Sequence, residues 1–130
     1  MVTLEELVGR RLVFGLVGPD LTDTDVRLFR DTHAGGIMLY RRNFETPERF
    51  RALIDGLEEA VGRRLLITTD HEGGRIIMLN RGVTIFPDGL AAGTSADAHF
   101  VERQGLIEGR ELRRLGVDIN FAPVLDVLTE

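Results

Sequence analysis

The glycine pair Gly73-Gly74 is flanked by side chains that can do chemistry: Asp70, His71, Glu72 and Arg75. A carboxylate accepts hydrogen bonds through two oxygens, so Asp70 is a candidate for holding two adjacent hydroxyl groups of a ligand. The alternative is that Asp70 caps the following turn, because aspartate before glycine is a common turn signal. Arg75 either lines the same site or forms an ion pair within the loop, and the sequence leaves both interpretations open.

A metal site is not predicted at these residues. His71 and Glu72 follow Asp70 directly, and three consecutive residues cannot easily converge on one ion. A second histidine one helical turn later, as a zinc-protease motif requires, does not follow. The glycine pair also lacks the spacing and the lysine of a phosphate-binding loop. We therefore predict neither a metal nor another cofactor.

The reactive segment follows an apolar run, 65–69, that indicates a buried strand. Three further apolar runs, 12–17, 36–40 and 117–121, also lead into polar residues, and a short capped helix at 3–11 precedes the first of them. Helical patterns separate the runs, so the sequence predicts a parallel sheet. Ligand sites of parallel α/β folds lie at the carboxyl ends of the strands, where these polar residues gather.

Start and stop signals mark the helices between the strands. Thr22 opens a capping-box-like pattern with Asp25, and Thr46 stands directly before Pro47, a favoured first helical residue. Gly62 closes the second of these helices. The apolar face of that helix is formed by Phe50, Leu53, Ile54, Leu57 and Val61.

The segment 76–94 fits no long element. It contains several glycines and Pro87, and only a short extended piece is predicted, at 76–79. A loop of this length in a compact domain is more often functional than incidental. A third helix is predicted to follow, from Ser95 to Gly116.

Composition limits the classes of function. The 130 residues suffice for one domain with an apolar core, and the lack of cysteine excludes disulfides and thiolate zinc sites. Acidic and basic residues are interleaved at a net charge of −5, so no nucleic-acid partner is predicted. No run approaches the roughly 20 apolar residues of a membrane span, and the first residues do not resemble a secretory signal. No membrane partner and a cytoplasmic location are therefore expected.

Three segments, in this order, resemble the N-terminal half of the catalytic barrel of family 3 glycoside hydrolases. They are 35–44 (GGIMLYRRNF), 69–75 (TDHEGGR) and 111–127 (ELRRLGVDINFAPVLDV). They are most similar to bacterial β-N-acetylhexosaminidases, which release N-acetylglucosamine from peptidoglycan fragments during wall recycling. The resemblance implies an α/β fold, a parallel (β/α) barrel of TIM type, with residues 1–130 as its N-terminal part and the sugar site at the strand carboxyl ends.

The resemblance also implies roles for single residues. Asp70 matches an aspartate that binds the hydroxyls of the terminal sugar, and Arg75 and Asp126 are the other predicted substrate-binding residues. Capping of a helix or turn after Pro123 is the alternative role for Asp126. A departure from the pattern is Met78, where hexosaminidases of the family usually carry an arginine near the sugar.

For the other polar residues near the strand ends we predict structural contacts. Asp118 and Asn120 alternate with apolar residues, which predicts a polar face turned into the barrel with hydrogen-bond partners on neighbouring strands. For Arg41, Arg42 and Asn43, a structural ion-pair network at the barrel mouth is favoured over shaping the floor of the sugar site.

No catalytic residue is assigned within this chain. In the family the nucleophile is an aspartate on a later strand, and in the hexosaminidase branch a histidine paired with an aspartate carries the proton; both come after the last matching segment. A complete barrel of this type needs about 250 residues, so four strands amount to half of one. The expectation is a truncated glycosidase that is inactive alone and that uses a retaining mechanism when complete.

The alternative is a non-catalytic half-barrel that binds sugar or is merely structural. Unpaired strand edges at 12–17 and 117–121 favour pairing with another chain. A homo-oligomer, in the form of a dimer that closes eight strands from two copies, is therefore predicted in place of a stable monomer.

Overall fold

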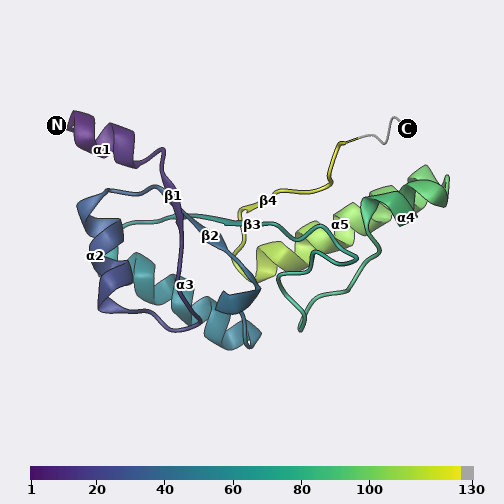
Figure 1. Cartoon of the computed structure of the whole chain (residues 1–130), viewed down its shortest axis with the longest axis horizontal. Helices are drawn as coiled ribbons and strands as arrows, with labels where there is room; N and C mark the ends of the chain where they lie inside the picture. The colour runs from purple at the N-terminus through teal and green to yellow at the C-terminus, as the bar shows by residue number, and fades with distance from the viewer. Residues whose placement is uncertain (127–130) are drawn as a thin grey trace.

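Strands and helices alternate along the chain as predicted, and the computed structural model describes residues 1–126 (Figure 1). The elements are α1 (Leu4–Gly9), β1 (Val13–Gly15), α2 (Asp23–Asp31), β2 (Gly36–Leu39), the 3₁₀ helix η1 (Arg41–Asn43), α3 (Pro47–Val61), β3 (Leu66–Thr69), α4 (Gly89–Thr94), α5 (Ala98–Arg114) and β4 (Ile119–Asn120). The strands form one parallel sheet in the order β1-β2-β3-β4. The predicted α/β class with four parallel strands is confirmed.

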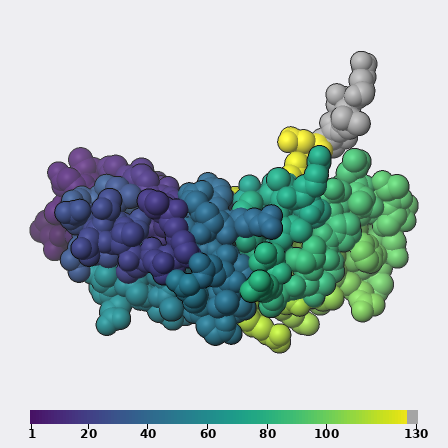
Figure 2. Space-filling view, turned by 60° about the horizontal axis from the view of Figure 1, so that its bottom comes forward, coloured from purple at the N-terminus to yellow at the C-terminus, as the bar shows by residue number. Residues whose placement is uncertain are grey.

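Helices cover one face of the sheet. Phe14, Ile37 and Ile67 are register neighbours on this face, and both isoleucines are fully buried. Phe14 packs edge to face on Phe29 of α2, with ring centroids 6.2 Å apart. The pair α2 and α3 lies at one end of an elongated molecule and α4 with α5 at the other (Figures 1 and 2). The apolar core therefore lies between the sheet and its helices.

The opposite face of the sheet is open. Val13 is 43% exposed, Leu66 42%, Ile119 38% and Phe121 54%, although all four are large apolar residues. Within residues 1–126, the edge strands β1 and β4 each have one partner strand. The described part of the chain thus leaves an apolar sheet face and two strand edges uncovered.

The predicted caps form as the sequence indicates. Thr22 and Asp25 make a reciprocal capping box, and the Thr46 side chain accepts a hydrogen bond from the backbone at the start of α3, with Pro47 at its first position. Gly62 ends α3 with φ +70°, a left-handed conformation that favours glycine. The helices that support the sheet are therefore specified locally.

The prediction for 76–116 needs two corrections. The segment 76–94 is not all loop, because its last six residues form α4, capped by the Asp88 side chain, which accepts from Ala91 N–H at 2.9 Å. The next helix begins at Ala98 and not at Ser95, since Asp97 is its cap and Ala96 has φ +53°. Glycine disfavours helix interiors, so the sequence pattern predicts a loop here, whereas the Asp88 cap supports a short helix.

The face predicted for Asp118 and Asn120 is wrong. Asn120 hydrogen-bonds Glu108 of α5, and Asp118 pairs with Arg113 of the same helix, so both point to the helix-covered side. The apolar neighbour Ile119 faces the open side and is exposed. Alternation alone does not say which face is covered. The predicted hydrogen bond to a neighbouring strand does form, because Asp118 Oδ2 accepts from Ile67 N–H of β3 at 3.0 Å, and α5 supplies further polar partners.

Candidate functional site

Asp70 follows β3 directly, at the edge where the carboxyl ends of the parallel strands meet. It is half-buried, and no backbone N–H of residues 1–126 donates to its carboxylate. The turn-capping interpretation of Asp70 is therefore not supported. Partial burial, followed by the charge of Asp70 and a hydrogen bond with it, raises the pKa of Glu72 above its ordinary value. The two carboxyl groups thus interact at one end of the loop.

The glycine pair bends the loop back on the chain. Gly73 has φ +85° and Gly74 has φ +56°, conformations that side chains rarely adopt. A Cβ on Gly73 would lie 2.6 Å from the carbonyl oxygen of Pro87, and Gly74 N–H donates to the carbonyl of Phe86 at 2.9 Å. The glycines therefore allow the loop after β3 to approach the segment before α4 closely.

His71 is a buried anchor of the same loop, 1% exposed. Its Nδ1 accepts hydrogen bonds from the backbone N–H groups of Met78 (3.2 Å) and Leu79 (3.3 Å). Burial lowers the pKa of His71 from its usual 6.5, which favours the neutral imidazole that such an acceptor requires. This histidine has a structural role that the sequence pattern did not reveal.

The contribution of His71 to the stability of the chain should fall as the pH drops below about 6.5. Because the pKa of His71 is lowered in the folded state, the unfolded chain takes up a proton there more readily. The contribution of His71 is complete above the unfolded pKa and declines as the pH falls toward the folded pKa. Urea midpoints between about pH 5 and 7.5 measure it. A His71→Gln variant should show a shallower dependence on pH, and an identical slope would contradict the prediction.

Arg75 and Asp126 line one hollow of about 910 Å³, which also includes Glu72 and the first residues of α4. We call it the Arg75 hollow. Both predicted residues are exposed there, and within residues 1–126 no ion pair engages Arg75. The structure therefore brings Arg75 and Asp126 together in one hollow. Asp70 does not line this hollow, but its carboxyl group interacts with that of Glu72, which does.

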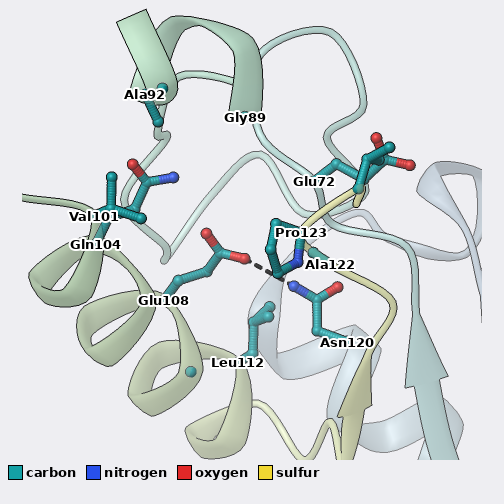
Figure 3. Close-up of a pocket in the computed structure, with 14 residues that line it drawn as sticks. Glu72, Gly89, Ala92, Val101, Gln104, Glu108, Leu112, Asn120, Ala122 and Pro123 are labelled. Carbon is teal, nitrogen blue, oxygen red and sulfur yellow. Dashed lines mark hydrogen bonds between the residues drawn. The ribbon is translucent and has the colours of Figure 1, made fainter. Parts of the chain in front are cut away.

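A second cavity, of about 520 Å³, shares Glu72 with the first and lies between α5 and the end of β4. Figure 3 shows Glu108 pointing from α5 into this Glu108 pocket, where its carboxylate accepts from Asn120 Nδ2 at 2.8 Å. Burial raises the pKa of Glu108, and the hydrogen bond from Asn120 offsets part of this rise. Sequence reasoning missed Glu108, although a glutamate four residues before Leu112 on the apolar face of a helix was a usable signal.

The segment after β2 has a structural role, but the predicted ion-pair network does not form. Within residues 1–126, Arg41 and Arg42 make no ion pair, and the contacts of the segment are hydrogen bonds to the backbone. Asn43 is buried, and its amide donates to the carbonyls of Leu16 (3.2 Å) and Gly18 (2.8 Å). Arg42 also donates to the Leu16 carbonyl, at 3.0 Å, and lies over the Tyr40 ring. These residues hold the β1–α2 connection against the end of β2.

Comparison with known proteins identifies the family. The model of the glycosyl hydrolase family 3 N-terminal domain matches residues 4–130. The chain belongs to this family. The predicted resemblance is thereby confirmed, and the four-stranded sheet is part of the TIM-barrel-like N-terminal domain of family 3. None of the helices within residues 1–126 is both long and apolar enough to cross a membrane.

Several hexosaminidases and glucosaminidases are similar to this chain. A beta-hexosaminidase of Methylobacillus flagellatus is 38% identical over 122 residues, which cover 89% of this chain and 35% of that protein. The structure of a family 3 beta-N-acetylglucosaminidase from Paenibacillus sp. str. FPU-7 matches 98% of this chain and 25% of that one, with a TM-score of 0.91 at 36% identity. A beta-N-acetylhexosaminidase from Beutenbergia cavernae matches the whole chain and 40% of its own, with a TM-score of 0.85 at 26% identity. This chain spans about a third of the length of the curated relatives it matches.

Proposed function

We propose that this chain forms the sugar-binding part of a glycoside hydrolase that removes terminal β-linked N-acetylhexosamine, with N-acetylglucosamine of peptidoglycan fragments as the substrate. The observation that carries the proposal is the carboxylate of Asp70 at the carboxyl end of β3 in a family 3 domain, to which no backbone N–H of residues 1–126 donates. Its two oxygens suit two neighbouring hydroxyls. Arg75 and Asp126, which share a hollow next to Glu72, are the other residues proposed to contact the substrate.

The proposed reaction retains the configuration of the sugar. A carboxylate attacks the anomeric carbon and forms a glycosyl-enzyme, while a proton carrier protonates the leaving oxygen; water then releases the sugar with the same carrier as base. We place the nucleophile and the proton carrier in the two thirds of the relatives' length that this chain does not cover. The residues described here bind and orient the sugar.

The 130-residue chain by itself should therefore show no glycosidase activity, because both reactive groups must be held at the anomeric centre. The assay is turnover of an aryl N-acetylglucosaminide by the purified chain. The full-length Methylobacillus flagellatus relative serves as the positive control and a mock preparation as the blank. Turnover above the blank would contradict this expectation and would locate catalytic groups within the chain.

A second candidate function is a non-catalytic half-barrel that oligomerises. It is favoured by the open apolar face and by the edges of β1 and β4, which have no second partner strand within residues 1–126. Two copies related by a two-fold axis would set β4 of each beside β1 of the other and close eight strands. Light scattering should then give twice the mass of one chain. A monodisperse, cooperatively unfolding monomer at micromolar concentration would rule out this mode of assembly.

A further inference from the structure

The side chain of Asn120, at the end of β4, pairs with the backbone of the residue after Asp70. Its Oδ1 accepts from His71 N–H at 2.8 Å, and its Nδ2 donates to the His71 carbonyl at 2.9 Å. An amide that offers both a donor and an acceptor to one residue imitates a neighbouring strand. The last backbone bond between these strands runs from Phe121 to Thr69, at 2.9 Å. The Asn120 side chain therefore continues the pairing beyond the point where the backbone stops.

Glu108 holds the same amide from the helix side. Asn120 Nδ2 donates its second hydrogen to Glu108 Oε1 at 2.8 Å across the Glu108 pocket (Figure 3). A flipped amide would set its oxygen against both this carboxylate and the His71 carbonyl, and neither has a hydrogen to donate when Glu108 is ionised. Glu108 thus selects the amide orientation that fits His71.

Asp70 lies between two immobilised neighbours. Thr69 is fully buried, and its hydroxyl donates to the Leu39 carbonyl at 3.0 Å. His71 is buried and clasped by Asn120 through its backbone. We propose that Asn120, oriented by Glu108, is a positioning residue that holds the His71 peptide and thereby sets the place of the Asp70 carboxylate. This inference rests on the proposed function in one respect: Asp70 is the residue that binds the sugar.

Amide hydrogen exchange of the ¹⁵N-labelled chain tests the contact directly. Asn120→Ala should accelerate exchange of the His71 amide about 10- to 100-fold relative to that of Leu57 in α3, since a buried hydrogen bond is lost. Thr68→Val is the matched control, because it removes a buried hydrogen bond made by β3, to the Ile37 carbonyl at 2.9 Å, and leaves Asn120 in place. Thr68→Val should change the exchange rate of the His71 amide, relative to the reference amide, by less than about threefold. An unchanged His71 ratio in Asn120→Ala would overturn the inference.

The variant Asn120→Asp tests the part played by Glu108. It sets a carboxylate against Glu108, with Glu111 on the same helix and Glu72 in the same pocket adding negative charge. The protection factor of the His71 amide should be low at neutral pH and rise about tenfold on acidification, when the two carboxyls share a proton. Asn120→Ala should show no such rise, and Asn120→Asp combined with Glu108→Gln should remove it. A pH-independent protection factor in Asn120→Asp would remove Glu108 from the proposal.

Titration with N-acetylglucosamine separates this inference from the proposed function. Asn120→Ala and Asp70→Ala should each weaken sugar binding at least about tenfold, while Thr68→Val should not. A normal affinity in Asp70→Ala, together with the expected His71 exchange, would reject the sugar-binding role of Asp70 and keep the positioning by Asn120. A normal affinity in Asn120→Ala, with weak binding in Asp70→Ala, would show that Asp70 is placed by other groups and would overturn the inference.

Discussion

Replacing Asp70 by alanine in an active glycosidase that contains this chain should lower kcat/KM by about 10²- to 10⁴-fold. The carboxylate is proposed to hold two sugar hydroxyls, and charge-assisted hydrogen bonds contribute about 1.5 to 3 kcal/mol each. The melting temperature should change little, because no backbone N–H of residues 1–126 donates to this side chain. Steady-state kinetics and thermal unfolding measure the two effects.

The matched control for Asp70 is Asp97→Ala. The Asp97 side chain caps α5 by accepting from Phe100 N–H at 3.0 Å, so its loss should cost about 1 kcal/mol of stability and leave kcat/KM unchanged. An Asp70→Ala enzyme with normal kinetics and a sharply lower melting temperature would assign Asp70 a structural role.

Gly73→Ala should destabilise the chain by about 2 to 4 kcal/mol. The left-handed conformation at φ +85° costs a residue with a Cβ about 1 to 2 kcal/mol. The new Cβ would also lie 2.6 Å from the Pro87 carbonyl and 2.9 Å from that of Phe86, so the segment before α4 would have to move. The urea midpoint measures the loss.

Gly105→Ala in α5 provides the contrast. A Cβ at Gly105 meets nothing within 4 Å, so alanine there should stabilise the helix by up to about 1 kcal/mol. Equal effects of the two substitutions would show that the loop after β3 adapts freely and does not hold Asp70 in one place.

Local signals predicted most of the scaffold. The caps at Thr22 and Thr46 are formed by residues three apart, so the sequence pattern contains all of their chemistry. The strands appear where apolar runs meet polar residues, although β4 is only Ile119–Asn120 because the chain leaves the sheet there. The short helix α4 was missed because the glycines within it outweighed its cap at Asp88.

The site was less predictable because its contacts join distant parts of the chain. Asp70 was singled out by its place after a strand and by resemblance, and its sugar-binding role stays a prediction. The bonds from Asn120 to His71 span 49 residues, and no periodicity encodes such a pair. The side chain of Asn120 points toward Glu108 of α5. A strand pattern does not specify on which face of the sheet such a helix packs.

The strand order β1-β2-β3-β4 bears on how this domain is made by the ribosome. Within residues 1–126 each strand pairs only with the strand immediately before or after it in the chain, so each new strand finds its partner already synthesised. Synthesis proceeds from the N-terminus, and each βα unit can dock on the previous one as soon as it emerges. We therefore expect the sheet to assemble strand by strand during translation, with its exposed apolar face presented to chaperones until it is covered.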